Sequence, residues 1–186
     1  MWSKNDIERI LVSEDDLRER VEQMGQQITA DYAGKDLLMV CILQGSIVFT
    51  ADLSRKVDLP VETDSMSVSS YGDAAVTSGS ITIRKDLRIP IEGRHVLLIE
   101  DVIDSGITIK SLVELLKKRN PASLEVAAML RKQNPQQVDV DVRYVGFECP
   151  DEFLVGYGLD YAQRYRTLPY VGVLKPEVYG GESRAL

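Results

Sequence analysis

The sequence has 186 residues, of which 44% are hydrophobic and 27% charged, the balance of an ordinary globular protein with one sizeable core. A net charge of −7 argues against a general nucleic-acid binder, because it lacks a large field that would attract phosphate backbones. No apolar run approaches the ~20 residues of a membrane span, and the first residues lack the apolar stretch of a secretory signal, so the expected location is cytoplasmic.

The first half of the chain predicts alternating helices and strands. Ser13 with Asp16 three residues later resembles a capping box, with Asp in place of the usual Glu or Gln. Helical spacing follows at Leu17, Val21, Met24, Ile28 and Tyr32, and Gly34 ends this helix. The elements expected next are a strand at Leu37–Leu43, a helix from about Ser46 to Val57, a strand from Val61 to Tyr71 and a small, polar loop from Gly72 to Ser80.

The second half continues this alternation. We expect a buried strand at Val96–Ile99, a helix from Ile107 to Arg119, and strands near Leu124–Leu130, Val140–Phe147 and Val171–Leu174. Such alternation predicts a three-layer α/β fold with a mainly parallel sheet. With no internal repeat or linker, the chain is expected to form one domain over residues 1–186, with a frayed tail from about residue 180.

Cysteine and histidine are too scarce to suggest a metal centre of the zinc type. The two cysteines, Cys41 and Cys149, each lie in a mostly apolar stretch, so we interpret them as small buried hydrophobes in a reducing compartment. The one histidine, His95, precedes the strand at Val96, at the end opposite the candidate site described next. A structural or solvated role is expected for it.

Residues 96–108, VLLIEDVIDSGIT, contain most of the chemistry, and their turn has the composition of a phosphate-binding loop. Ser105 and Thr108 supply hydroxyls, and Gly106 allows the backbone to approach a ligand closely. The amides that open the following helix are unpaired donors at the positive end of its dipole. Asp104 would repel a phosphate, so we expect its carboxylate to point elsewhere and to serve another purpose.

Glu100 and Asp101, adjacent carboxylates before the turn, indicate a second kind of ligand. Two acids beside a phosphate cost energy unless they bind hydroxyl donors or cations. A vicinal diol offers such donors, and Mg²⁺ takes carboxylate and hydroxyl oxygens. Together these features fit a phosphorylated sugar such as ribose 5-phosphate. The alternative is a strand end with two solvated acids before a helix-capping turn.

Residues 99–108, IEDVIDSGIT, closely resemble the donor-binding signature of type I phosphoribosyltransferases. The resemblance implies the three-layer α/β fold of that family, with a mainly parallel central sheet and a small hood over the site. It also implies Mg²⁺ as cofactor and phosphoribosyl pyrophosphate as donor. The donor would be bound by Glu100, Asp101, Asp104, Ser105, Gly106, Ile107 and Thr108. Neither the Gly-x4-Gly-Lys-Ser/Thr loop nor the Gly-x-Gly-x-x-Gly fingerprint occurs.

Two segments nearer the N-terminus resemble the hypoxanthine/guanine branch of this family. Gln44 and Gly45 follow the first buried strand, where the family has its pyrophosphate loop and where the preceding peptide bond can be cis. Gln44 stands where relatives often have Lys or Arg, so binding there is expected from the backbone. Ser70 and Tyr71 resemble the start of a flexible loop that closes over the site. The alternative for them is an ordinary exposed loop.

Residues 145–161, VGFECPDEFLVGYGLDY, are the strongest marker of this branch. By resemblance, Phe153 stacks on the purine and the backbone of Leu154 reads its edge. Asp160 matches an acid near the base and a second metal, so that it would join Glu100 and Asp101 as a metal ligand.

The resemblance assigns two basic residues and the catalytic group as well. Arg166 matches a residue that binds pyrophosphate. Lys132 matches the lysine that donates to the purine 6-oxo group, which favours hypoxanthine and guanine over adenine. Asp104 is the candidate general base that handles the proton at N7. The implied activity is purine salvage to IMP or GMP, in a homodimer or homotetramer.

Two other functions stay open. One is a regulatory protein of this fold that senses phosphoribosyl pyrophosphate while it binds RNA or DNA, since fold alone does not settle function. The other is a phosphoribosyltransferase that prefers xanthine or another base. The net charge and the presence of Asp104 favour the enzyme over the regulator.

Overall fold

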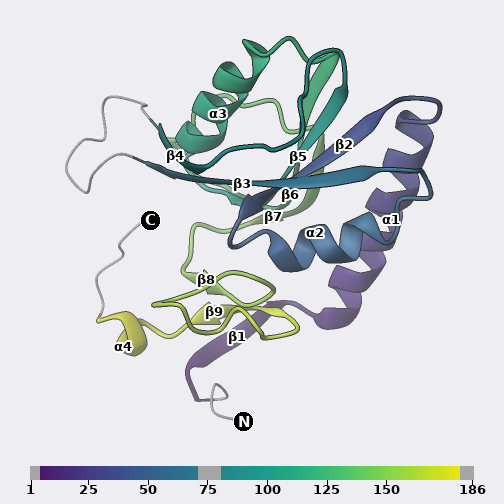
Figure 1. Cartoon of the computed structure of the whole chain (residues 1–186). Coiled ribbons are helices and arrows are strands. Elements are labelled where there is room, and N and C mark those ends of the chain that lie inside the picture. The colour runs from purple at the N-terminus through teal and green to yellow at the C-terminus, as the bar shows by residue number, and fades with distance from the viewer. Residues whose placement is uncertain (1–4, 71–80, 181–186) are drawn as a thin grey trace.

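The computed structural model describes residues 5–180 except 71–80 (Figure 1). Its strands are β1 (Ile7–Val12), β2 (Leu37–Leu43), β3 (Glu62–Ser70), β4 (Ile81–Lys85), β5 (His95–Ile103), β6 (Ser123–Lys132), β7 (Tyr144–Cys149), β8 (Leu154–Val155) and β9 (Val171–Leu174). Its helices are α1 (Glu14–Asp31), α2 (Ile47–Ser54), α3 (Ile107–Lys117) and α4 (Pro176–Tyr179).

The main sheet has six strands in the order β4-β3-β2-β5-β6-β7. Five neighbouring strands run parallel to one another: β3, β2, β5, β6 and β7. The edge strand β4 pairs antiparallel with β3. The chain leaves β2 toward β3 and later returns to the other side of β2 with β5. This reversal of strand order creates a switch point, and ligands of open α/β sheets bind at the carboxyl ends of the strands there.

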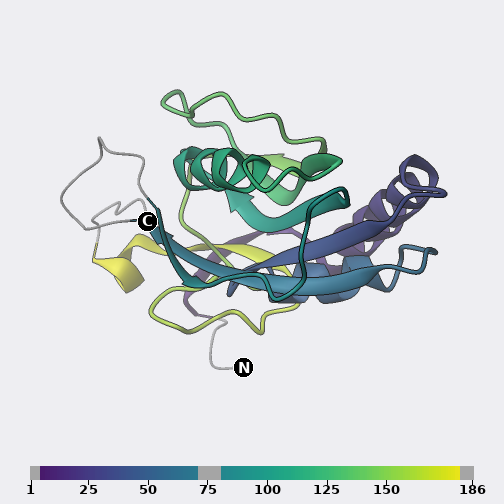
Figure 2. The same cartoon turned by 45° about the horizontal axis from the view of Figure 1, so that its top comes forward.

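Helices cover both faces of the main sheet, with α1 and α2 on one face and α3 on the other (Figures 1 and 2). Successive residues of a strand point to opposite faces, so β2 and β5 contribute to two separate cores. Met39 and Leu97 pack with the α1 side, whereas Val40 and Leu98 pack with α3. Because both faces are buried, these strands are almost continuously apolar.

A small second sheet, in the order β1-β9-β8, lies apart from the main one. We call β1, α4 and residues 153–174, which include β8 and β9, the hood. β1 and β9 pair antiparallel although they lie at opposite ends of the sequence. Val155, Tyr165, Leu168 and Leu174 form the buried cluster of the hood.

The predicted α/β fold with a mainly parallel sheet is confirmed, and so are most of its elements. The strands at Leu37–Leu43 and Val171–Leu174 have the predicted limits, and Ser13 and Asp16 form the expected capping box. Cys41 and Cys149 are buried free thiols, and burial raises the pKa of Cys149 to about 11. In the described part of the chain, no helix is both long and apolar enough to cross a membrane.

Some predicted limits were wrong. The strand expected to end at Ile99 continues to Ile103, so the two acids lie within β5 and not after it. The helices expected to reach Val57 and Arg119 end at Ser54 and Lys117. The strand expected from Val140 begins only at Tyr144, because Val140 packs with the α3-side core instead of pairing.

Four elements were not predicted: β1, β4, β8 and α4. They are short, and β1 is formed only through pairing with a remote strand. The loop expected at Gly72–Ser80 lies outside the described residues, as does most of the tail.

Candidate active site

The carboxyl ends of β2 and β5 bring the first two predicted segments together. Gln44 and Gly45 follow β2 directly, and the peptide bond between Leu43 and Gln44 is cis. A Cβ atom added at Gly45 would collide with Oδ2 of Asp101 in β5. Only glycine therefore allows the loop after β2 to lie against the acids of β5.

The hood is packed against the same loop through a second glycine. Gly158 has a φ of +104°, and a Cβ atom there would collide with the carbonyl oxygen of Gly45. Arg166 donates to the carbonyl of Gly158 at 2.8 Å and thereby fixes this close approach from the other side. The loop after β2 is thus held between the main sheet and the hood.

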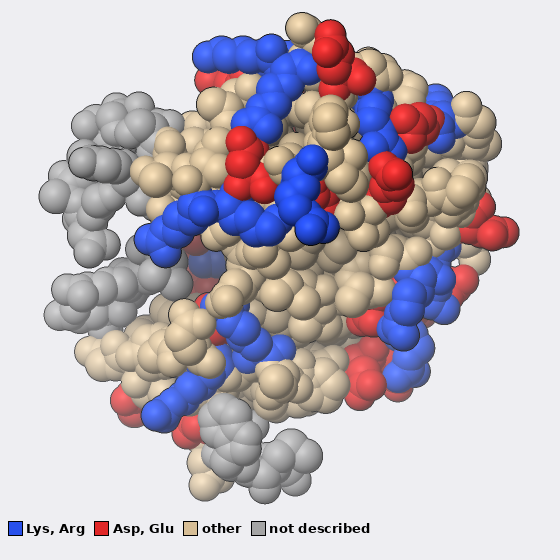
Figure 3. Space-filling model, in the orientation of Figure 1, with Lys and Arg blue, Asp and Glu red and all other residues tan. Residues whose placement is uncertain are grey.

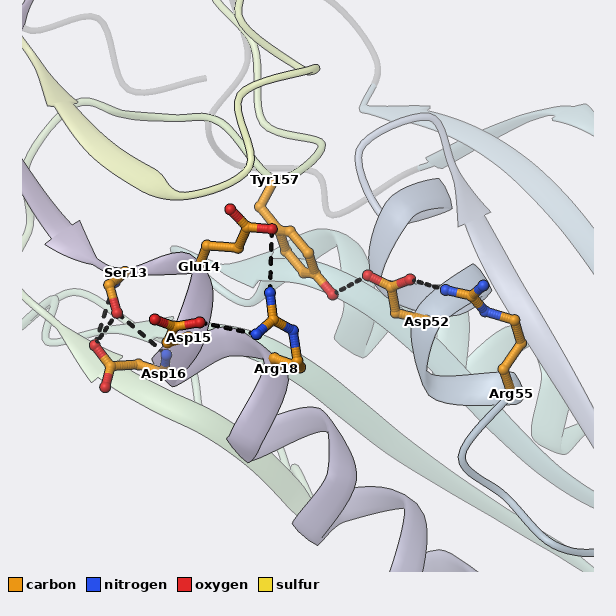
Figure 4. A network of polar contacts seen from close by, with 8 residues as sticks. All are labelled: Ser13, Glu14, Asp15, Asp16, Arg18, Asp52, Arg55 and Tyr157. Atoms are coloured by element: carbon orange, nitrogen blue, oxygen red, sulfur yellow. Dashed lines mark hydrogen bonds and ion pairs between the residues drawn. The ribbon is translucent and has the colours of Figure 1, made fainter.

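A side-chain link from the hood to α2 supports this contact (Figure 4). The Tyr157 hydroxyl donates to Asp52 at 2.8 Å, and Arg55 donates to the other oxygen of that carboxylate at 2.6 Å. Burial raises the pKa of Tyr157, so its hydroxyl remains a donor. Nearby at the start of α1, Arg18 pairs with Glu14 at 3.3 Å.

The turn between β5 and α3 presents backbone amides to the site. Gly106 precedes α3 with a φ of +76°, a conformation that favours glycine, and no side chain caps the helix there. The hydroxyl of Ser105 accepts weakly from the amide of Ile107 at 3.4 Å. Because no side chain caps the helix in the usual way, the first amides of α3 would be donors for an anion.

A cavity of about 320 Å³ opens at this edge of the sheet. Ten of the predicted site residues line it: Glu100, Asp101, Asp104, Ser105, Gly106, Thr108, Lys132, Phe153, Leu154 and Asp160. They come from β5, the turn after it, α3, β6 and the hood, so the cavity combines distant parts of the sequence.

Four predicted residues do not line this cavity. Gln44 is exposed. Gly45 and Ile107 are near residues that line the cavity in the sequence, but they do not line it themselves. Arg166 faces a different hollow, between α1, α2 and the hood, and forms an ion pair with Asp160 at 2.7 Å. The Ser70 side chain and Tyr71 lie outside what the structure describes.

Burial makes it costly for Glu100 and Asp101 to be ionised together without a ligand. Burial, and then the charge of Asp101, raises the pKa of Glu100 well above its usual range. Burial also raises the pKa of Asp101, although its Oδ1 accepts from the amide of Val102 at 2.7 Å. A cation or hydroxyl donors bound here would relieve this cost.

The Asp104 carboxylate contacts side chains at and just after the end of β6. Its Oδ2 lies 2.9 Å from Nζ of Lys132, and its Oδ1 accepts from Nδ2 of Asn134 at 3.1 Å. Lys132 also lies 3.3 Å from Asp151. The Lys132 and Asp104 side chains are 13% and 20% exposed, so this ion pair is largely shielded from water.

Two aromatic rings pack against Phe153, another residue of the cavity wall. Its ring stacks on Tyr179 of α4 with centroids 4.8 Å apart, and Tyr161 meets it edge-on at 5.5 Å. Phe153 lines the cavity, and neither Tyr179 nor Tyr161 is among the lining residues. Such a ring offers a flat apolar surface to a heterocycle.

Several residues that shape this site carry no functional signal in the sequence. Val68, Leu112 and Leu159 add apolar wall, and each reads as an ordinary core residue in the sequence. Asn134 and Gln137 hold the turn after β5 from a separate loop. Only Gly158, two residues after Gly156, could have suggested a close backbone approach.

The fold and the site together define a nucleotide-handling α/β protein of the phosphoribosyltransferase type. The family model of the phosphoribosyl transferase domain matches residues 13–162. The chain therefore belongs to the phosphoribosyltransferase family.

The names of similar proteins specify the activity more narrowly than the family does. The chain is 47% identical over 176 residues to the hypoxanthine-guanine phosphoribosyltransferase of Bacillus subtilis, covering 95% of this chain and 98% of that protein. It is 49% identical to the bifunctional protein TilS/HprT of Listeria monocytogenes, of whose length it spans only 27%. The crystal structure of a hypoxanthine phosphoribosyltransferase from Staphylococcus aureus matches with a TM-score of 0.93 and 45% identity, covering 96% of this chain and 97% of that one.

Proposed function

We propose that the chain is a purine salvage enzyme, a pentosyltransferase. It would transfer the 5-phosphoribosyl group from phosphoribosyl pyrophosphate to hypoxanthine or guanine, giving IMP or GMP and pyrophosphate. Relatives named for this activity match almost the full chain at 47% identity. The cavity supplies, from separate elements, groups suited to each part of the two substrates.

The observation that carries the proposal is the shielded pair of Lys132 and Asp104 in a cavity that Phe153 also lines. A 6-oxopurine presents an acceptor, the 6-oxo oxygen, next to a donor, the N7–H group. The Lys132 ammonium and the Asp104 carboxylate, 2.9 Å apart, are the complementary donor and acceptor at a matching spacing. Adenine has a 6-amino donor instead, which would face the ammonium without a hydrogen bond.

The transfer step follows from these contacts. The amides at the start of α3 and the hydroxyls of Ser105 and Thr108 would bind the 5′-phosphate. The bond from C1′ to pyrophosphate breaks with its electrons on the leaving group, N9 forms the new bond, and the N7 proton passes to Asp104. Positive charge develops on the sugar, so the nearby carboxylates stabilise the transition state more than the ground state.

The residues present fit Mg²⁺ as a partner of the donor. Among the described residues, no group of three or more His, Cys, Asp or Glu side chains could hold a metal by itself. Mg²⁺ commonly takes one or two carboxylates and completes its shell with water and substrate phosphates. Glu100 and Asp101, and Asp160 for a second ion, would hold it. Bound there, it would offset the charge of the leaving pyrophosphate, together with Arg166 and the amides near Gly45.

Incubation of the purified protein with phosphoribosyl pyrophosphate, Mg²⁺ and one base at a time tests this function. We expect IMP from hypoxanthine and GMP from guanine, measured by chromatography, and at most a trace of AMP from adenine. Product from xanthine alone would support the xanthine-preferring alternative. Absence of product with every purine would refute the proposal.

The nucleic-acid-binding regulator is the competing candidate. On the face drawn in Figure 3, acidic and basic side chains are intermingled, which does not favour a phosphate backbone. Filter binding of labelled RNA and DNA at moderate salt, beside the enzyme assay, separates the two functions.

We also propose a cytoplasmic enzyme that forms one domain over residues 1–186 and assembles as a homodimer or homotetramer. Free buried thiols at Cys41 and Cys149 support a reducing compartment. Ile10 and Ile47 are 55% and 47% exposed, and a second copy would cover such apolar side chains. Sedimentation of the purified chain tests the assembly.

A further inference from the structure

Asp104 is held by two side chains from one stretch of chain, the end of β6 and the turn after it. Lys132 lies on Oδ2 at 2.9 Å, and the Asn134 amide donates to Oδ1 at 3.1 Å. One oxygen therefore has a cation as partner and the other a neutral amide. We propose that Asn134 is a positioning residue, which holds Asp104 toward the base during transfer. This inference rests on the function proposed above.

The Asn134 amide and Lys132 have different roles, because Lys132 also has to donate to the purine. When the Lys132 ammonium donates to the 6-oxo group, its hold on Asp104 weakens, and Oδ2 turns to the N7–H group. Asn134 then remains the fixed side-chain contact of the carboxylate. The amide has no proton to release near neutral pH, so Oδ1 stays a hydrogen-bond acceptor and Oδ2 takes the N7 proton.

Asn134 is itself fixed in one orientation. Its Oδ1 accepts from the amide of Gln136 at 2.8 Å, while Nδ2 faces Asp104. Turning the side-chain amide over would lose both bonds. The same turn is fastened to the backbone of the catalytic segment, since Gln137 Nε2 donates to the carbonyl of Asp104 at 2.7 Å and the amide of Val138 donates to Ser105 at 2.9 Å.

These two contacts of Asn134 can be separated by substitution. Asn134→Asp keeps an oxygen for the Gln136 amide and replaces the Nδ2 donor by an oxygen that repels Asp104. We expect kcat to fall roughly 10- to 100-fold, as for loss of a hydrogen bond to a charged group, with the KM for the donor changed by no more than about 3-fold. Gln136→Ala is the matched control, because its exposed side chain lies in the same turn and kcat is expected to stay at the wild-type value.

A double-mutant cycle distinguishes positioning from a role in the turn alone. Asn134→Ala is expected to lower kcat in the wild-type background and to have almost no further effect in an Asp104→Asn background. Wild-type kcat in Asn134→Asp would overturn the inference. So would an equal loss from Asn134→Ala in both backgrounds, and this cycle decides the matter if Asn134→Asp fails to fold. An inactive wild-type enzyme would instead refute the proposed function.

Discussion

The two sides of the cavity that we assign to the donor and to the base are built in different ways. On the side assigned to the donor, the two acids, the turn after β5 and the start of α3 all come from one continuous segment, residues 100–108. The base side combines Lys132 from β6 with Phe153 and Leu154 from the hood. A continuous segment fixes its groups through backbone geometry, whereas an assembled wall depends on contacts between elements. We therefore expect donor-side changes to affect the chemical step and base-side changes to affect the choice of base.

The largest effect is expected from Asp104→Asn, at the boundary between the two sides. Loss of a general base lowers kcat by roughly 10² to 10⁴. The KM for phosphoribosyl pyrophosphate should stay within about 3-fold, because the phosphate is bound by backbone amides and hydroxyls. Steady-state kinetics with hypoxanthine measures both values. Unchanged turnover would remove Asp104 from the role of base.

Lys132→Ala is expected to have the next largest effect, and a selective one. A hydrogen bond from a charged donor contributes about 1.5–3 kcal/mol, so kcat/KM for hypoxanthine and guanine should fall roughly 10- to 150-fold. Any slow reaction with adenine should fall much less, since adenine makes no such bond. Competition between bases in one reaction gives the ratio. An equal loss for all bases would contradict the assignment.

Phe153→Leu keeps an apolar side chain but removes the flat ring. Aromatic stacking contributes about 0.5–1.5 kcal/mol beyond burial, so the KM for the base should rise roughly 2- to 12-fold. The KM for the donor should not change. Comparable increases for both substrates would mean that the hood as a whole had moved, a change that the near-ultraviolet circular dichroism would register.

The smallest effect concerns stability and belongs to the donor side. Because burial, and then the charge of Asp101, raises the pKa of Glu100, the contribution of Glu100 to the stability of the ligand-free protein is most favourable at low pH and is lost as pH rises through that raised pKa. Glu100→Gln should therefore raise the melting temperature by a few degrees at pH 8 and have little effect near pH 5. Thermal unfolding without Mg²⁺ or donor checks this. A lower melting temperature at pH 8 would show that the Glu100 charge stabilises the free protein.

The same difference explains which parts could be predicted from the sequence. The apolar run before Glu100, and the Ser, Gly and Thr after it, are local signals, so strand, turn and helix were found together. Phe153 and Lys132 were identified only through resemblance to the family. β1 could not be found, because its strand exists only through pairing with β9. Asn134 was missed because nothing in its neighbourhood marks a contact with Asp104, thirty residues earlier.

A crystal structure of the chain with IMP tests the central claim most directly. We expect the 5′-phosphate within about 3 Å of the amides between Ser105 and Thr108, and the ribose hydroxyls at Glu100 and Asp101. The base should lie against Phe153 with its 6-oxo group at Lys132. A nucleotide bound elsewhere, with that turn facing away and both acids contacting only water, would contradict the account.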